Sequence, residues 1–404
     1  MRDVMGSWLL VCAVVVAQLA TVNSQGTAVI RTRGKPGDPC EFADGVVGEC
    51  TELRACRASG GVIRRLSTTT RGAAASVCSS SSTGVYICCR RPHIIAENMC
   101  SVWSRYWSAA SRTFNNTCVT QRPLIYDGEE AILGEFPNMV SLGKWEDGQR
   151  KWQCGGTLIT PFFVLTAAHC ISSDHVVTLG EHDRSAPGTG VLPRLDLGFP
   201  PGLWGEERFR FNAVPHTSIE QMINVTEVFV YPEYQSRYHD IALLKLQYPA
   251  TLTARVLPSC LPNSRVQHFD TSVSFIVAGW GAVTPHGDNS DKLRKAKINY
   301  IDPNECIDMW SSNPLVRPPW GITSDLICAG AEGKDSCRGD SGGPLMQESN
   351  LPEVLAGTCM PREVAGIVSF GPLCGRLGAY TKVASYLDWI TAIVAPKASS
   401  SPIV

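Results

Sequence analysis

The chain has 404 residues, which is enough for two or three domains, one of them large enough to bury a full hydrophobic core. Its formal net charge of −1 balances 36 Lys and Arg against 37 Asp and Glu. This balance gives no case for nucleic-acid binding or for a general attraction to membrane surfaces.

The first residues are typical of a secretory signal peptide. Arg2 precedes an apolar run from Trp8 to Ala17, and small residues follow near Val22 and Ser24. We therefore expect residues 1–24 to be removed by cleavage after Ser24 and the mature protein to be secreted. A membrane anchor is the alternative, but the apolar run is short and no second spanning segment follows it.

The cysteine count also indicates an oxidising compartment. Seventeen cysteines are present, and removal of Cys12 with the signal peptide leaves an even number. Zinc ligation is the alternative, but no CxxC pair occurs together with histidines at metal-binding spacing, so we expect no metal and no cofactor. Two sequons, at Asn115 and Asn224, could carry N-linked glycans.

Six cysteines between Cys40 and Cys89 form a compact cluster that ends in a CC pair. This Gly- and Ser-rich segment cannot build a sufficient apolar core and needs disulfides, each contributing about 2–4 kcal/mol. The spacing resembles the clip domain of arthropod protease zymogens, which we expect over residues 38–91. A generic disulfide knot is the alternative, and the spacing alone leaves the connectivity open. The resemblance implies the pairs Cys40–Cys88, Cys50–Cys78 and Cys56–Cys89.

Residues 92–124 are expected to form a linker and activation region. Its large aromatic side chains, Trp103, Tyr106 and Trp107, should not remain solvated, so we expect part of the linker to dock on the following domain.

From Ile125 onward, short alternating strands separated by turn residues recur, for example in residues 152–159, 162–168, 176–180, 275–281 and 364–370. This pattern predicts an all-β, two-barrel protein. Apolar residues at helical spacing from Ser385 to Val394 predict a closing C-terminal helix, followed by a tail at residues 396–404. The Pro- and Gly-rich segment from Ser185 to Ile223 has no assigned role.

Three segments contain a candidate catalytic set in the order His, Asp, Ser. They are VLTAAHC with His169, DIALLKL beginning at Asp240, and KDSCRGDSGGPL with Ser341. A serine hydroxyl is a poor nucleophile near neutral pH unless a histidine takes its proton and a buried carboxylate orients the histidine. These segments resemble the chymotrypsin-fold serine proteases, over residues 125–395. The resemblance implies that Ser341 is the nucleophile, His169 the general base and then acid, and Asp240 the orienting group.

The same resemblance implies an oxyanion hole and a specificity pocket. Backbone N–H groups of Gly339 and Ser341 should face the developing oxyanion. Asp335 stands where trypsin-like members have the carboxylate at the base of the pocket, and Gly371 and Gly378 stand where the pocket walls are kept open. A buried carboxylate needs a cationic partner, which a substrate Arg or Lys would supply.

Three points leave the pocket open to other interpretations. Asp335 could instead pair with Lys334 or another neighbour. Only three residues separate Cys374 from Gly378, fewer than in digestive trypsins, which could alter the pocket floor. Phe370 stands where most relatives have Trp.

The segment IYDGEEAILGEFP, from Ile125, resembles the new N-terminus that activation releases in this family. Cutting before Ile125 would free an ammonium that pairs with Asp340. The preceding residue is Leu124, after which a trypsin-like enzyme does not readily cleave, so an upstream protease with apolar specificity is implied. Cleavage after Arg122 is the alternative, but it would leave Pro123 and Leu124 in front of the amine.

Leu before IxxG, the EFPNM string and the extra cysteines resemble class C of the clip proteases, such as the snake-type cascade proteases. That resemblance implies three disulfides within the protease, one between the linker and the protease, and a pair formed by the remaining two cysteines. These are, in order, Cys154–Cys170, Cys306–Cys328, Cys337–Cys374, Cys118–Cys260 and Cys100–Cys359.

The resemblance thus implies a secreted zymogen of a trypsin-like serine endopeptidase (S1 type) in an extracellular, haemolymph-like fluid. It would activate a downstream clip-protease zymogen in an immune (Toll or melanisation) or developmental cascade, and a serpin would inhibit it. A stand-alone, for example digestive, protease is one alternative. Another is a catalytically silent clip protease homologue that acts as a cofactor, although such homologues typically lack the nucleophile. A calcium site in the loop at Glu181 would rest on one acidic residue, so no metal is predicted.

Overall fold

The computed structural model describes residues 39–41, 47–52, 77–81, 84–89 and 92–113, and then residues 128–394 except 147–148, 187, 189–191, 196, 198–218, 264–266, 268, 285–286, 312–317, 333–335, 348–360, 372–373 and 375–376. The chain divides into two compact units, Met1–Arg91 and Pro92–Val404, each of which is described by itself. The predicted signal peptide, most of the segment 185–223 and the tail at 396–404 lie outside the described residues.

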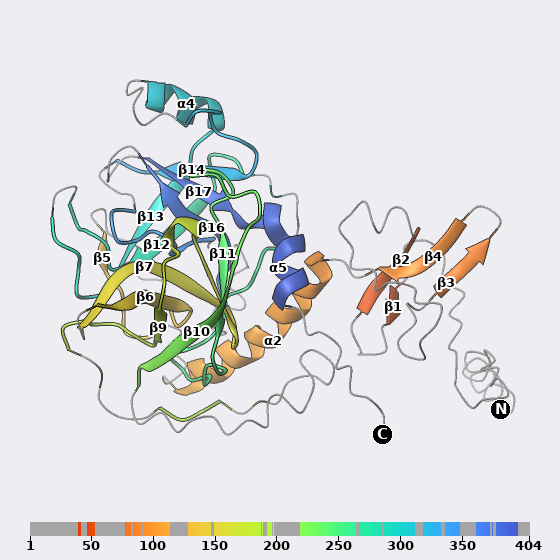
Figure 1. The fold of residues 1–404 in the computed structure, drawn as a ribbon, viewed down its shortest axis with the longest axis horizontal. Coiled ribbons are helices and arrows are strands. Elements are labelled where there is room, and N and C mark those ends of the chain that lie inside the picture. The colour runs from red at the N-terminus through yellow and green to blue at the C-terminus, as the bar shows by residue number, and fades with distance from the viewer. Residues whose placement is uncertain are drawn as a thin grey trace, which may run out of the picture. The chain divides into compact units, whose positions relative to one another are not determined.

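The first unit contains a small antiparallel sheet in the order β1-β2-β4-β3 (Figure 1). Its strands are β1 (Pro39–Glu41), β2 (Val47–Glu52), β3 (Val77–Ser81) and β4 (Gly84–Cys89). Cys50 is buried and disulfide-bonded. The side chains of the other cysteines predicted to form the clip disulfides lie outside the described residues.

Most of the second unit is built from two antiparallel barrels, which confirms the predicted all-β, two-barrel architecture (Figure 1). The first is closed in the order β10-β11-β8-β7-β6-β9. Its strands are β6 (Met139–Glu146), β7 (Gln149–Thr160), β8 (Phe163–Thr166), β9 (His175–Leu179), β10 (Gln221–Val230) and β11 (Ala242–Leu246). Asn224, with its glycosylation sequon, is exposed on β10.

The second barrel has the strand order β12-β15-β16-β17-β14-β13, and a further pairing of β12 with β13 completes the ring. Its strands are β12 (Ser274–Gly279), β13 (Arg294–Tyr300), β14 (Leu326–Gly330), β15 (Pro344–Gln347), β16 (Glu363–Phe370) and β17 (Gly378–Lys382). The short strand β5 (Glu129–Glu130) pairs with β13, and α4 (Pro303–Ser311) lies between β13 and β14 in the chain.

The linker forms the long helix α2 (Pro92–Thr113), an element that the sequence analysis did not predict. Proline suits the first position of a helix because its missing N–H has no partner there. Apolar residues recur every three or four positions and form one face of the helix, which is buried in the core of the second unit. They are Ile95, Ala96, Met99, Val102, Trp103, Tyr106, Trp107 and Ala110.

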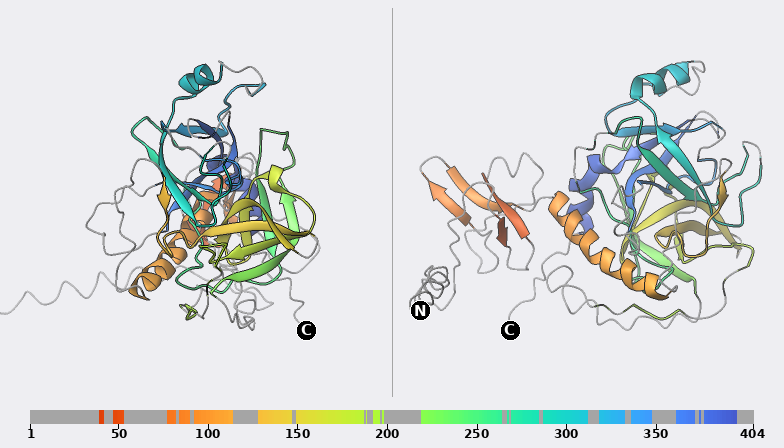
Figure 2. Two further views of the ribbon diagram at one scale, coloured as in Figure 1. Left: turned by 90° about the vertical axis from the view of Figure 1, so that its left-hand side faces the viewer. Right: turned by 180° about the vertical axis from the view of Figure 1, so that it is seen from behind.

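Helix α2 lies beside the C-terminal helix α5 (Leu387–Val394), as two views show (Figures 1 and 2). The Trp107 indole donates a hydrogen bond of 2.9 Å to the Pro258 carbonyl. The predicted C-terminal helix is present, although its first turn, η3 (Val383–Tyr386), is a 3-10 helix. Among the described residues, no helix is both long and apolar enough to cross a membrane.

The structure forms Cys154–Cys170, Cys306–Cys328 and Cys337–Cys374, the three pairs expected within the protease. The other two pairs were wrong. Helix α2 brings the Cα of Cys100 to 4.8 Å from that of Cys260, and the two residues are disulfide-bonded. Because a cysteine forms a single disulfide, this bond excludes both Cys100–Cys359 and Cys118–Cys260 from this structure.

Candidate active site

His169 and Asp240 lie in contact, each next to the end of a strand of the first barrel. His169 belongs to the 3-10 turn η1 (Ala168–Cys170), which follows β8, and Asp240 lies just before β11. The His169 Nδ1 is 2.7 Å from Asp240 Oδ2, and the His169 backbone N–H donates to Asp240 Oδ1 at 2.9 Å. The Asp240 side chain is 1% exposed and that of His169 is 32% exposed. An enclosed carboxylate therefore holds an imidazole whose other edge can reach solvent or substrate.

Two hydroxyl groups that the sequence analysis missed also hold Asp240. The Ser369 hydroxyl donates to Asp240 Oδ2, and the Thr381 hydroxyl donates to the Asp240 backbone carbonyl at 3.0 Å. Ser369 is near the end of β16 and Thr381 is in β17, so the second barrel fixes a carboxylate that belongs to the first. These contacts favour the tautomer in which Nδ1 carries the hydrogen and donates a hydrogen bond to Asp240, which leaves Nε2 as the basic nitrogen of the ring.

The turn that contains Ser341 packs on the same region of the first barrel. The Gly155 backbone N–H, in β7, donates to the Ser341 carbonyl at 2.7 Å, and the Thr166 hydroxyl donates to the Gly155 carbonyl at 2.9 Å. Thr166 ends β8, three residues before His169. The structure shows no hydrogen bond between the Ser341 hydroxyl and the His169 ring, both of which it describes. Such bonds are often long before substrate binds.

The backbone around Ser341 leaves two donors available. Gly339 has φ +99°, a conformation that side chains rarely adopt, and an added Cβ would lie 3.1 Å from the Gly281 Cα. In the described part of the chain, neither Gly339 nor Ser341 donates its backbone N–H in a hydrogen bond, whereas the N–H of Gly343 donates to the Asp340 carbonyl at 2.9 Å. Two neighbouring N–H groups without acceptors are what an oxyanion hole needs.

The Asp340 carboxylate is turned away from Ser341 and into a tight enclosure. It accepts hydrogen bonds from the backbone N–H groups of Gly281, at 2.7 Å, and of Cys337, at 2.9 Å. A Cβ added to Gly281 would lie 2.5 Å from the Asp340 Cγ, so only glycine leaves room for this carboxylate. Burial raises the pKa of Asp340, while the two backbone hydrogen bonds and the charge of Arg184 act in the opposite direction.

Arg184 is the nearby cation. Its guanidinium carbon is 4.7 Å from the ring centroid of Trp152 and 4.6 Å from that of Trp280, and it donates to the Ser141 hydroxyl. Burial lowers the pKa of Arg184 to about 10, and the charges of Glu181 and Asp340 act in the opposite direction, so it remains protonated at neutral pH. Ile125, the predicted partner of Asp340 after activation, lies outside the described residues, as does Leu124.

The predicted pocket residues are only partly described. Gly371 is exposed directly after β16, and Gly378 begins β17. The Cys337–Cys374 disulfide joins the Ser341 loop to the segment between these strands, and the Ser336 and Tyr380 hydroxyls are 3.2 Å apart. The Ser336 contact lies beside β17; Asp335 is outside the described residues.

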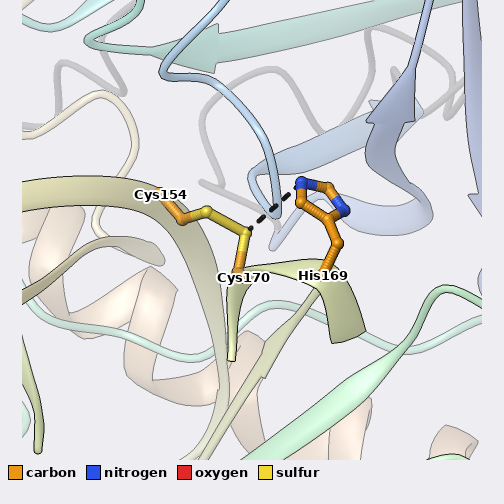
Figure 3. A group of neighbouring side chains, drawn as sticks. All are labelled: Cys154, His169 and Cys170. Atoms are coloured by element: carbon orange, nitrogen blue, oxygen red, sulfur yellow. Dashed lines mark hydrogen bonds between the residues drawn. A yellow bond between two sulfur atoms is a disulfide. The ribbon is translucent and has the colours of Figure 1, made fainter. Parts of the chain in front are cut away.

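One group of side chains has the composition of a metal site without its chemistry. Cys154, His169 and Cys170 lie together, with His169 Nε2 3.7 Å from the Cys170 sulfur (Figure 3). The two cysteines form a disulfide, so neither can supply the thiolate that a metal would need. The contact instead packs the imidazole against a covalent link between β7 and η1.

Comparisons with known proteins agree with this geometry. Residues 125–192 and 210–390 match the family model described as Trypsin. The chain is 32% identical to serine protease snk of Drosophila melanogaster over 80% of this chain and 71% of that protein. It is 34% identical to phenoloxidase-activating factor 3 of Holotrichia diomphalia, over 66% and 71% of the two chains. Identity to venom serine protease Bi-VSP of Bombus ignitus is 30%, over 86% and 90%.

Proposed function

Because this chain belongs to the trypsin family of serine endopeptidases, and within it is similar to the clip-domain proteases of the snake type, we propose that Ser341, His169 and Asp240 form its catalytic triad. The observation that carries the proposal is the 2.7 Å contact between His169 Nδ1 and the enclosed Asp240 carboxylate, next to the Ser341 turn. A histidine held in this way has one basic nitrogen available to a serine.

In the proposed reaction, the Ser341 hydroxyl oxygen attacks the scissile carbonyl while His169 Nε2 takes its proton. The carbonyl oxygen becomes negatively charged and accepts hydrogen bonds from the N–H groups of Gly339 and Ser341. His169 then gives the proton to the leaving amine, and the acyl group remains on Ser341. Water, activated by the same nitrogen, attacks the acyl carbon and releases Ser341 with its hydroxyl restored.

We further propose cleavage after Arg or Lys, with Asp335 at the base of a pocket that Gly371 and Gly378 keep open. A guanidinium or ammonium in the substrate would offset the cost of burying this carboxylate. The Cys337–Cys374 disulfide supports this assignment because it ties the two pocket segments together.

The proposed mature protein is a secreted zymogen with a clip domain at 38–91, a linker and activation region at 92–124, and a protease domain at 125–395. An upstream protease with apolar specificity would cut after Leu124, and the new Ile125 ammonium would pair with Asp340. The name of one similar protein, phenoloxidase-activating factor 3, describes an activating role, and for this chain we propose activation of a downstream protease zymogen. Glycosylation at Asn224, which is exposed, and at Asn115 belongs to the same proposal, as does inhibition by a serpin.

The experiment replaces the sequence before Ile125 with an enterokinase site and compares the protein before and after cutting. We expect hydrolysis of short substrates ending in Arg or Lys, only after cutting, and little hydrolysis of those ending in Phe or Leu. Turnover of the apolar substrates would reject Asp335 as the specificity residue. Absence of turnover, together with absence of labelling by a serine-directed phosphonylating reagent, would favour a catalytically silent cofactor.

The Cys100–Cys260 disulfide predicts how the cut protein behaves on a denaturing gel. After cleavage at Leu124, the wild type should migrate as one species without reductant and as two fragments with it. The double variant Cys100→Ser, Cys118→Ser should give two fragments under both conditions, because it loses the Cys100–Cys260 bond and any bond that Cys118 could make across the cut. Cys118→Ser is the matched control and should behave like the wild type. If Cys118→Ser alone gave two fragments without reductant, this result would contradict the Cys100–Cys260 bond and favour Cys118–Cys260.

A further inference from the structure

A cation and two aromatic side chains lie beside the proposed triad. Arg237 precedes Asp240 by three residues, and its guanidinium carbon is 5.6 Å from the Phe370 ring centroid. Phe370 directly follows Ser369, whose hydroxyl donates to Asp240. Arg237 lies in the segment before β11 of the first barrel, and Phe370 ends β16 of the second. The two barrels therefore bring these side chains into contact.

A buried tryptophan side chain packs against the Phe370 ring. The Trp310 side chain, 2% exposed, has its ring centroid 5.4 Å from that of Phe370. Phe370 itself is half-buried at the end of β16. Because Trp310 is packed in the core, the ring on which the guanidinium lies is a stable platform.

The second aromatic side chain is Trp320, which is 62% exposed. The Tyr238 ring lies 4.6 Å from it, centroid to centroid. The Tyr238 hydroxyl donates to the Gly321 carbonyl at 3.0 Å and accepts from the Trp320 backbone N–H at 2.8 Å. These hydrogen bonds fix the loop and keep the exposed Trp320 indole next to Tyr238, the residue that follows Arg237. An exposed Trp is typical of a binding surface.

The strand end shows where a substrate would meet these side chains. β16 ends at Phe370, and the exposed Gly371 follows it. An extended peptide whose carbonyl lies at Ser341 can pair its backbone with such a strand end, in the manner of an added strand. Its residues on the amino side of the cut then lie against Phe370, Arg237 and Trp320.

Two carboxylates in this region, those of Asp240 and Asp325, have hydrogen-bond partners of their own. Asp240 accepts the His169 and Ser369 hydrogen bonds. Asp325 accepts a 2.9 Å hydrogen bond from the Tyr386 hydroxyl and lies 3.5 Å from His239 Nδ1. A guanidinium has five N–H donors and can bind more than one partner at a time. It can therefore take a substrate carboxylate in addition to the partners it already has.

We propose that Arg237 selects substrates with an acidic side chain among the second to fourth residues before the cut. The Phe370 and Trp320 rings would contact the apolar stem of that Asp or Glu, and Arg237 would bind its carboxylate. The inference rests on the proposed protease function and adds to it the charge of the substrate at a second position.

The test uses the full chain, activated before Ile125 and adjusted to equal active sites with a serine-directed titrant. Tetrapeptide substrates end in Arg and have Glu, Gln or Lys at the second, third or fourth residue before the cut. We expect Glu to exceed Gln in kcat/KM by about 5- to 10-fold at one of these positions and to lose this advantage in high salt.

Arg237→Gln should bring the Glu-to-Gln ratio of kcat/KM close to unity. Arg237→Glu should reverse the preference toward Lys. The control is Lys245→Gln, which removes an equal charge from the pair between Lys245 of β11 and Glu227 of β10 and should keep the ratio of the parent.

An acidic preference that survives in Arg237→Gln would overturn the inference, as would a parent enzyme that cleaves all Arg substrates equally well. Both results leave the proposed protease function standing. If the titrated parent cleaves no substrate ending in Arg or Lys, the proposed function fails and this inference fails with it.

Discussion

Replacing Ser341 with alanine is expected to lower the kcat of the activated protein by about 10⁶-fold. The variant keeps the turn, because Gly155 binds the Ser341 backbone carbonyl and not the side chain. It loses the only atom that can form the acyl intermediate in the proposed reaction. The measurement is the initial rate of hydrolysis of a peptide substrate ending in Arg, with the variant activated before Ile125 in the same way as the parent.

A double-variant cycle tests whether Ser341 and His169 act together. It compares the kcat of Ser341→Ala, of His169→Ala and of the variant with both replacements. If Ser341 and His169 act as one unit, each single replacement removes nearly all of the effect, and the double variant is hardly slower than either. Losses that multiply would mean that the two residues act independently. A Ser341→Ala protein that keeps more than about 1% of the parent rate would contradict the proposed nucleophile.

Asp240→Asn is expected to lower kcat by about 10⁴-fold at neutral pH. The asparagine amide can keep its oxygen toward the His169 backbone N–H, the 2.9 Å contact at Oδ1. Its NH₂ group then faces Nδ1 in place of Oδ2, so that Nδ1 becomes the acceptor and Nε2 holds the proton. A ring with a protonated Nε2 cannot take the Ser341 proton, although its position is unchanged.

The control for this prediction is Asp325→Asn. Asp325 binds the Tyr386 hydroxyl at 2.9 Å and lies near His239, but it is not bonded to His169. Asp325→Asn should therefore change kcat by no more than about tenfold. If the effect is larger, a variant with Tyr386 replaced shows whether the lost hydrogen bond to Tyr386 causes it. Comparable losses for the two aspartate variants would mean that charge near the site, and not the Nδ1 contact, supports catalysis.

The sequence predicted the parts of the fold that follow from local patterns. Alternating strands such as residues 364–370 became β16, and the His169 and Asp240 segments came together as their contexts implied. Helix α2 was missed because a segment between two cysteine-rich regions looks like a linker, although its apolar residues do have helical spacing. That omission also explains the wrong disulfides, since only the packed helix shows that Cys100 reaches Cys260.

Much of the site depends on residues that no short motif marks. Ser369 and Thr381 hold Asp240 from strands more than a hundred residues away in sequence, and serine or threonine in a strand is too common to single out. Gly281 is visible in the segment FIVAGWG, but its role follows from the approach of Asp340, which lies in a different segment. The family resemblance singled out Phe370 because most relatives have Trp at this position; its contact with Arg237 required the structure.

The bond between Cys100 and Cys260, together with the buried face of α2, has a consequence for how the enzyme meets its substrates. After a cut at Leu124, residues before the cut stay on the same particle as the proposed triad. A molecule held by the amino-terminal unit would then stay on one covalently linked particle with the protease, so that its encounter with the proposed triad would not depend on its dilution in the surrounding fluid. One surface can thus bind the substrate while another cleaves it. A protease site that binds its substrate weakly can then still act selectively on the bound molecule.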